Sequence, residues 1–238
     1  MECIKNRRTI RKYKADEVSV ELLNALLEEA FRASTMGNMQ LYSVVVTRDS
    51  QMKEKLAPAH FNQPMVTSAP VVLTFCADFN RFSKWCRCRQ AEPGYDNPIS
   101  FLNAASDALL VTQNFCTLAE AHGLGICYLG TTIYNPDKII ETLQLPELVM
   151  PVATITVGYP DECPSQPDRL PLEVFCMRKS IRIIRRKILT VFMPIRNRLP
   201  RIIVLLKKTA RRRWRKSLRM SVIRKRTMNT CRRTWKRL

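Results

Sequence analysis

Residues 99–130, ISFLNAASDALLVTQNFCTLAEAHGLGICYLG, decide the fold of this chain. Residues 99–122 are rich in alanine and leucine and predict one long helix, which Gly123 ends. Residues 126–129 then predict a short strand. The helix is apolar over more than one stripe, which is typical of a helix buried in the middle of a domain or of a dimer.

Three further segments predict strands. Residues 42–47 and 151–158 have the composition of β-strands. Residues 71–77, VVLTFCA, follow Pro70 and are apolar on both faces, so this strand is expected at the centre of a sheet. Residues 79–98 contain two proline breaks and are expected to be irregular.

Helices are predicted between these strands, each from a capping signal near its first residue. They are expected over residues 19–33 after Ser19, over 49–57 capped by Asp49 or Ser50, and over 135–143 with Asn135 as N-cap and Pro136 at the first helical position. Strands that alternate with helices indicate a layered α/β (α+β) domain.

Charge divides the chain into two parts. Residues 1–174 hold 16 Lys and Arg against 20 Asp and Glu, whereas residues 175–238 hold the other 24 basic residues and no acidic residue. The net charge of +20 is therefore no signature of nucleic-acid binding by the whole chain. The sequence predicts a body over residues 1–173 and a basic tail over 174–238 that does not belong to the same fold.

The nine cysteines do not predict a disulfide scaffold, because their number is odd, the chain is long, and its opening MECIKNRRTI is not an apolar signal segment. A reduced, cytoplasmic protein is expected. Cys86 and Cys88 form a CxC pair, but no second pair follows and only two histidines occur, so no metal site is predicted. No run of 18 apolar residues predicts a membrane span.

Three stretches contain residue types that suit a ligand site. Arg7-Arg8-Thr9-Ile10-Arg11 gathers three guanidiniums and a hydroxyl, which can bind a phosphate, although a solvated basic N-terminus is the alternative. Residues 34–40 form a polar turn that offers amide groups to a flat heterocycle, although an ordinary turn is the alternative. Residues 123–131 contain glycines that let backbone N–H groups approach a ligand, although they form no dinucleotide fingerprint.

Together and in this order, the three stretches resemble the nitroreductase family. RRTIRKY resembles the family's R-R-S-x-R-x-[FY] opening, and the turn ending in Gln40 resembles its S-x-x-N-x-Q-P-W segment, with Leu41-Tyr42 where Pro-Trp is usual. AEAHGLGICYLG resembles the family's A-x-x-x-G-L-G segment, and VGYP its terminal core strand. The resemblance extends over residues 1–173.

This resemblance implies a fold and an assembly. The fold would be a layered α/β domain with a mixed, mostly antiparallel sheet, surrounding helices and a long central helix. The protein would be an intertwined homodimer with one FMN per subunit at the interface. The long helix that is apolar on several faces also favours a dimer.

The resemblance implies site residues as well. Arg7, Arg8 and Thr9 would hold the FMN phosphate, and Arg11 would lie near the ribityl chain or the ring O2. The other subunit would reach the flavin with Thr35, Met36, Asn38 and Gln40. Leu129 and Gly130 would lie along the isoalloxazine ring, with backbone N–H groups near N5, and Asn62 would contact its pyrimidine edge.

By the same resemblance, NAD(P)H would deliver a hydride to flavin N5 and leave. A nitroaromatic, a quinone or a similar small molecule would then take electrons from the same face, in a ping-pong reaction. Arg11 would stabilise the anionic reduced flavin, and no side chain is required as a general acid. Two alternatives stay open: a flavin-free remnant of the fold, and nucleic-acid binding through the basic tail.

The tail has an interpretation of its own. Its 64 residues from position 175 contain no Asp, Glu or Gly, and they are rich in Ile, Leu and Trp, unlike an ordinary basic arm. A shifted reading frame allows acidic, helix-prone strings that resemble the family's C-terminal segment, with the break between Glu173 and about Met177. In the family that segment wraps the partner subunit and supplies a late Arg or Lys to the FMN phosphate. A poorly packed tail, a weaker dimer, weaker flavin binding and impaired activity are therefore expected.

Overall fold

The computed structural model describes residues 2–94 and 97–176, so the predicted basic tail lies outside the described residues except for its first three positions. The chain divides into two units, Met1–Gln166 and Pro167–Leu238. The first unit contains the sheet and the candidate site. The described part of the second contains one short helix, α8, Leu172–Phe175.

Four strands form one sheet in the order β1-β2-β4-β3. Their bounds are Tyr42–Thr47 for β1, Val71–Asp78 for β2, Gly125–Leu129 for β3 and Val149–Gly158 for β4. All three pairings are antiparallel, so the described residues contain no parallel pair. Every residue of β2 is buried, which confirms the central strand predicted after Pro70.

The helices connect these strands and cover both faces of the sheet. In chain order they are α1 Glu2–Lys5, α2 Val20–Ala30, α3 Ser50–Leu56, α4 Pro64–Ser68, α5 Asn80–Cys88, α6 Pro98–Ala121 and α7 Pro136–Leu143. Three short 3-10 helices complete the first unit: η1 Met36–Asn38, η2 Ala57–His60 and η3 Thr132–Tyr134. Among the described helices, none is long and apolar enough to span a bilayer.

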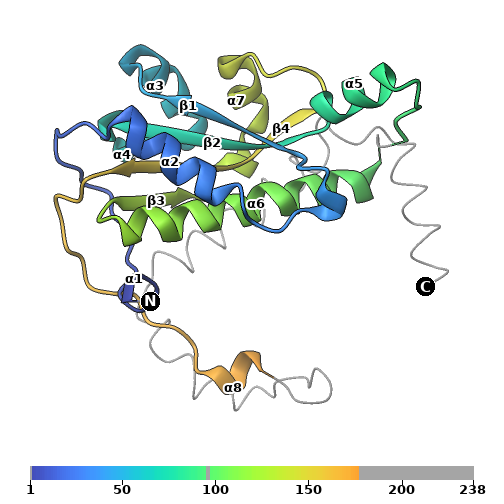
Figure 1. Ribbon diagram of the computed structural model, residues 1–238. Coiled ribbons are helices and arrows are strands. Elements are labelled where there is room, and N and C mark those ends of the chain that lie inside the picture. Colours follow the sequence, from blue (N-terminus) through green and yellow to red (C-terminus); the bar gives the residue numbers. More distant parts are fainter. Residues whose placement is uncertain (1, 95–96, 177–238) are drawn as a thin grey trace, which may run out of the picture. The chain divides into compact units, whose positions relative to one another are not determined.

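The first unit has three layers (Figure 1). Helices α2 and α6 lie on one face of the sheet, and α3, α4 and α7 lie on the other. The larger core lies between the sheet and α6, where the rings of Phe75 and Phe115 are 6.3 Å apart. Helix α6 buries residues along its whole length, which confirms the predicted long central helix.

The capping signals act largely as the sequence predicts. Ser19 accepts a hydrogen bond from the Leu22 amide at 3.1 Å, and Asp49 accepts one from Met52 at 2.8 Å. Helix α2 ends at residue 30 rather than 33. Asn135 precedes α7 as expected, but its side chain donates to the Ala59 carbonyl instead of capping the helix.

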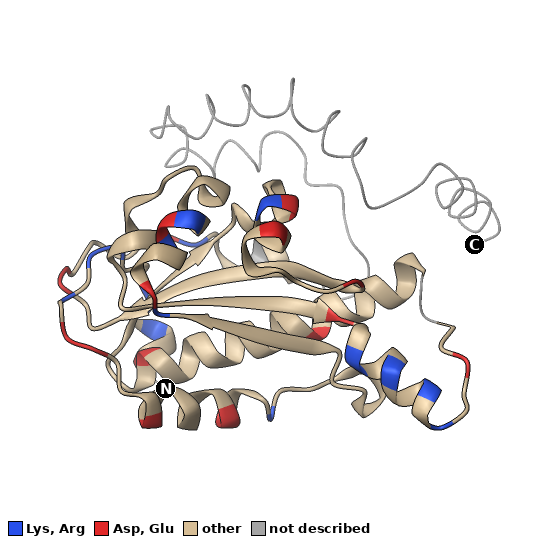
Figure 2. Ribbon diagram, turned by 90° about the horizontal axis from the view of Figure 1, so that it is seen from above, with Lys and Arg blue, Asp and Glu red and all other residues tan. Residues whose placement is uncertain are grey.

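Residues 80–88 correct the sequence prediction, because they form α5 where an irregular segment was expected. One side of this helix is buried through Ser83 and Cys86, and Figure 2 shows basic residues as blue bands along it. Asp78 supports the first turn by accepting a hydrogen bond from the Arg81 amide at 3.1 Å. The prolines that suggested breaks lie beyond the C-terminus of the helix and do not interrupt it.

Candidate functional site

The N-terminal strap, residues 6–14, lies along β3 and the end of β4. The Ile10 amide donates to the Ile126 carbonyl at 3.0 Å, and the Lys14 amide donates to Tyr159 at 2.9 Å. Ile10 is buried against Gly125, where an added Cβ would come within 2.8 Å of the Ile10 side chain. Gly125, which the sequence associated with ligand approach, therefore allows the strap to pack closely on the sheet.

The three arginines of the strap lie around the end of α6, β3 and residues 162–164. Arg7 is 3.9 Å from the Glu120 carboxylate. Arg8 donates to the Cys163 sulfur at 2.8 Å and to the Pro164 carbonyl at 3.2 Å. Arg11 is exposed. Burial raises the pKa of the Cys127 thiol, and the positive charge of Arg11 reduces this rise. The cations of the strap thus gather in one strip, together with the half-buried Thr9.

At the end of β3, Leu129 is buried and Gly130 is exposed. A Cβ added to Gly130 would meet nothing within 4 Å, so the backbone there is open to a ligand. The Thr131 hydroxyl lies 2.9 Å from His60 Nδ1, which brings the segment of Asn62 next to this turn. Asn62 is exposed and left-handed, with φ 53°. The segments that carry the predicted ring contacts Leu129, Gly130 and Asn62 are therefore neighbours.

His60 was assigned no role from the sequence. It is completely buried, and burial lowers its pKa to about 4. Its Nδ1 is next to the Thr131 hydroxyl, while Nε2 has no hydrogen-bond partner among the described residues. A neutral imidazole thus supports the turn after β3.

Residues 35–41 form a loop that begins in η1 and is held by Asp107 of α6. Asp107 is completely buried. Its carboxylate accepts hydrogen bonds from the Thr35 hydroxyl at 2.5 Å, the Met36 amide at 2.9 Å and the Leu41 amide at 3.4 Å. Asn38 and Gln40 are exposed. Sequence reasoning missed Asp107, although a single carboxylate in an otherwise apolar stretch of helix was the available signal.

The loop and the strap lie far apart within one chain. Asp107 contacts the loop and Glu120 contacts Arg7, and both belong to α6. Thirteen residues of helix separate them, which corresponds to roughly 20 Å along the axis at about 1.5 Å per residue. Arg7, Arg8, Thr9 and Arg11 belong to the strap, which packs at the Gly125 end of β3, whereas Leu129, Gly130 and Asn62 lie at the other end of that strand. These residues form a first group along β3. Thr35, Met36, Asn38 and Gln40 form a second group.

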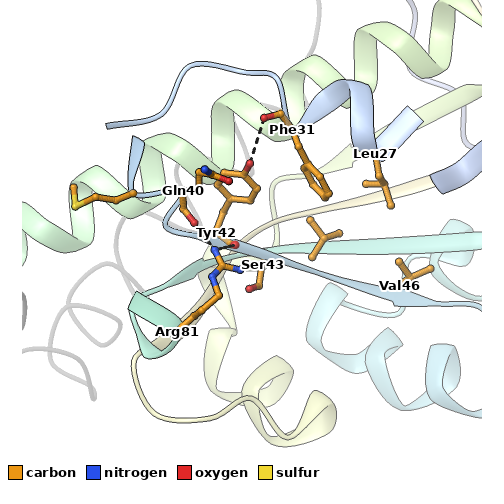
Figure 3. A pocket seen from close by; sticks show the side chains of 9 residues that line it. Leu27, Phe31, Gln40, Tyr42, Ser43, Val46 and Arg81 are labelled. Atoms are coloured by element: carbon orange, nitrogen blue, oxygen red, sulfur yellow. Dashed lines mark hydrogen bonds between the residues drawn. The ribbon is translucent and has the colours of Figure 1, made fainter. Parts of the chain in front are cut away.

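A cavity of about 490 Å³ lies beside the second group, between α2, β1 and Arg81 of α5. Figure 3 shows Arg81 reaching β1, where its guanidinium donates to the backbone carbonyls of Gln40 and Tyr42. Leu27 and Val46 line the apolar side of the cavity. Of the predicted cofactor contacts only Gln40 lines it, so this cavity is distinct from the strip of arginines. No group of three or more His, Cys, Asp or Glu residues that could hold a metal ion occurs in the described ranges.

Comparison with known proteins gives a consistent result. The family model described as "Nitroreductase family" matches residues 4–159. The FMN reductase (NADPH) of Bacillus subtilis is 33% identical over 173 residues, which cover 72% of this chain and 70% of that protein. The Cr(VI) reductase of a Pseudomonas species is 32% identical over 171 residues, which cover 72% of this chain and 70% of that one. The crystal structure of an oxidoreductase from Bacteroides fragilis aligns with a TM-score of 0.82 and 58% identity, and it covers 88% of this chain and 85% of its own.

Proposed function

Because this chain belongs to the nitroreductase family, we propose that it is an FMN-dependent oxidoreductase that takes electrons from NAD(P)H and passes them to a nitroaromatic, a quinone or a similar small acceptor. The names of the relatives support the coarse assignment, since they describe reduction of FMN with NADPH and reduction of Cr(VI). One observation supports it in this chain: the strap arginines lie beside β3, and the backbone is open at the far end of this strand, at Gly130.

The donor set of the strap suits the phosphate of FMN. A guanidinium has five N–H donors, and the contacts of Arg7 with Glu120 and of Arg8 with Cys163 and Pro164 leave several of them free for an anion. The hydroxyl of Thr9 adds one more donor. The open backbone at Gly130 leaves room for a flat ring beside Leu129 and Asn62. These residues therefore fit a flavin mononucleotide that lies along β3.

The site is completed by a second copy of the chain. Asn38 and Gln40 lie roughly 20 Å along α6 from the strap of their own chain, by the helical rise of about 1.5 Å per residue. A two-fold axis near α6 brings the loop of one copy to the strap of the other. Thr35, Met36, Asn38 and Gln40 then contact the flavin of the partner, and the protein is a homodimer.

Bound FMN supplies the two-electron chemistry that links NAD(P)H to the acceptor in two separate half-reactions, a ping-pong order. The residues of the chain bind the cofactor, orient it and supply positive charge to the site. Arg7, Arg8 and Thr9 would hold the phosphate, and Arg11 would supply a positive charge near the ring O2 that favours negative charge on the ring. The backbone N–H groups at Leu129 and Gly130 would lie near N5. No side chain donates a proton as a general acid.

Flavin titration tests this proposal. Arg7→Ala and Arg8→Ala each remove a charge-assisted hydrogen bond, so each weakens FMN binding by about 1.5–3 kcal/mol, or about 10- to 150-fold in Kd. Lys14→Ala is the matched control, because Lys14 is an exposed cation of the same strap. Flavin retention that is unchanged in the Arg7, Arg8 double variant refutes the assignment. A colourless wild-type protein that is retained on DNA in a salt-dependent manner favours the nucleic-acid alternative, and one that binds neither favours the flavin-free remnant.

Residues 1–173 form the family domain, and residues 174–238 are its C-terminal segment read in another frame. The absence of acidic residues after position 174 supports this part of the proposal. Sequencing the gene tests it: an inserted or missing base near codon 175 supports it, and a verified open frame through the basic tail refutes it. The location is cytoplasmic, which the eight free cysteines among the described residues support.

A further inference from the structure

Asp107 is a completely buried carboxylate, and its hydrogen bonds to the described residues all go to one loop. Its Oδ1 accepts from the Met36 amide at 2.9 Å, and its Oδ2 accepts from the Thr35 hydroxyl at 2.5 Å and the Leu41 amide at 3.4 Å. A buried carboxylate is costly unless it is hydrogen-bonded, so α6 and the loop depend on each other here. Asp107 is 66 to 72 residues from these partners in sequence.

The backbone conformation of the loop depends on contacts with its surroundings. Gly37, Asn38 and Gln40 are left-handed, with φ of 55°, 55° and 52°. Such conformations are disfavoured for residues other than glycine, and they persist where surrounding contacts impose them. Thr35 provides the link, because its hydroxyl donates to Asp107 and accepts from the Gln40 amide at 3.0 Å.

The loop is held through its backbone on both sides, which leaves its polar side chains outward. Arg81 of α5 donates to the Gln40 carbonyl (Figure 3), whereas the Gln40 amide donates to the Thr35 hydroxyl. The side chains of Asn38 and Gln40 are exposed and hydrogen-bond to each other at 3.3 Å. They are the exposed polar side chains that the loop offers to a ligand.

We propose that Asp107 is a positioning residue for flavin binding, which acts through Thr35 to fix the left-handed backbone that presents Asn38 and Gln40. The inference rests on the proposed function, since the flavin it serves is the one in the partner subunit. Asp107 itself does not touch the flavin. It supplies the fixed anion on the central helix that orders the loop before the ligand arrives, so the ordering cost is not paid on binding.

The test uses the full-length protein and FMN as the probe, with the Kd measured by quenching of flavin fluorescence. Asp107→Asn and Thr35→Val each weaken FMN binding about tenfold, the size of one hydrogen bond to a charged group. Thr35→Ser keeps the hydroxyl and stays within about threefold of wild type. The double variant Asp107→Asn, Thr35→Val binds FMN as well as the more weakly binding single variant does, because both changes break the same linkage. Thr67→Val is the matched control, since the Thr67 hydroxyl lies on α4, on the other face of the sheet, and donates to the Pro64 carbonyl of its own helix.

An FMN affinity that is unchanged in Asp107→Asn and Thr35→Val overturns the proposal, and so do losses that add in the double variant. If Asp107→Asn does not fold, the comparison of Thr35→Val with Thr35→Ser decides alone. Amide hydrogen exchange of residues 36–41 is measured in parallel on the flavin-free protein. Faster exchange in Asp107→Asn and Thr35→Val, but not in Thr35→Ser, supports the linkage even if the wild type binds no FMN. A wild-type protein that binds no FMN refutes only the proposed function.

Discussion

At the residue scale, two glycines determine how closely the strap lies on the sheet. Gly125 and Gly158 face each other in the pairing of β3 with β4. A Cβ on Gly125 would meet Ile10 at 2.8 Å, and one on Gly158 would meet Pro70 at 2.6 Å and Tyr13 at 2.9 Å. The positions of the strap arginines therefore depend on the absence of two side chains.

Gly125→Ala is expected to destabilise the protein by about 1–3 kcal/mol, because the added methyl displaces Ile10 and the strap. Urea unfolding measures this change. Gly130→Ala is the control, since its Cβ would meet nothing within 4 Å and its φ is not in the left-handed region. Equal stabilities of the two variants would show that the strap adjusts without cost.

His60 makes the stability depend on pH. Its pKa in the folded chain is about 4, against 6.5 when exposed. The unfolded chain therefore binds a proton between pH 6.5 and pH 4 that the folded chain does not bind. This contribution is fully present above pH 6.5 and is lost as the pH falls toward 4. From pH 7.5 to pH 5 the loss amounts to about 2 kcal/mol, at about 1.36 kcal/mol per pH unit.

His60→Gln is expected to remove this part of the pH dependence and to retain a polar partner for Thr131. The free energy of unfolding is measured for wild type and variant at pH 7.5 and pH 5. The carboxylates contribute equally to both proteins, so the difference between the two slopes isolates His60. Parallel slopes would mean that the buried imidazole takes up its proton without cost.

At the element scale, local signals predict the regular elements well. β1 spans the predicted residues 42–47, and α6 begins and ends one residue before its predicted bounds. α5 was missed because the prolines that follow it were read as breaks in the whole segment, and because its buried residues Ser83 and Cys86 stand in a basic sequence. The hold of Asp107 on the loop was missed because its partners are up to 72 residues away, and no local pattern encodes such a contact.

Ser19→Ala tests one such local signal. Removal of the hydroxyl that accepts from the Leu22 amide is expected to lower the free energy of unfolding by about 1 kcal/mol. Ser19→Asp keeps an acceptor and is expected to keep the stability. Ser68→Ala, at an exposed position at the end of α4, serves as the control in the same urea titration. A loss of equal size in Ser19→Asp would rule out capping as the cause.

At the scale of the whole molecule, one face of α6 stays apolar and exposed. Ile99, Leu102, Leu109 and Leu110 are 42–69% exposed in the single chain. Leucine and isoleucine at helical spacing on an exposed face mark an interaction surface. The proposed homodimer buries this face and joins each strap to the loop of the partner.

Leu102→Glu combined with Leu109→Glu is expected to dissociate the dimer, because it places four charges in an apolar interface that contains each position twice. Sedimentation velocity measures the assembly state, and FMN affinity falls with dissociation because each site needs both chains. Thr67→Glu, which adds a charge at an exposed position of α4 on the other face of the sheet, is the control. A wild-type monomer that binds FMN tightly would refute the two-chain site.

The strap also sets an order of events during synthesis. Its hydrogen bonds go to Ile126, to Tyr159 and, through the Lys12 carbonyl, to Asp161. A ribosome releases the N-terminus first, so the arginines emerge long before the strands on which they dock. Until residue 161 has been translated, Arg7, Arg8 and Arg11 belong to a loose basic segment. The nascent chain therefore acquires its strip of arginines only when the last strand of its sheet is in place.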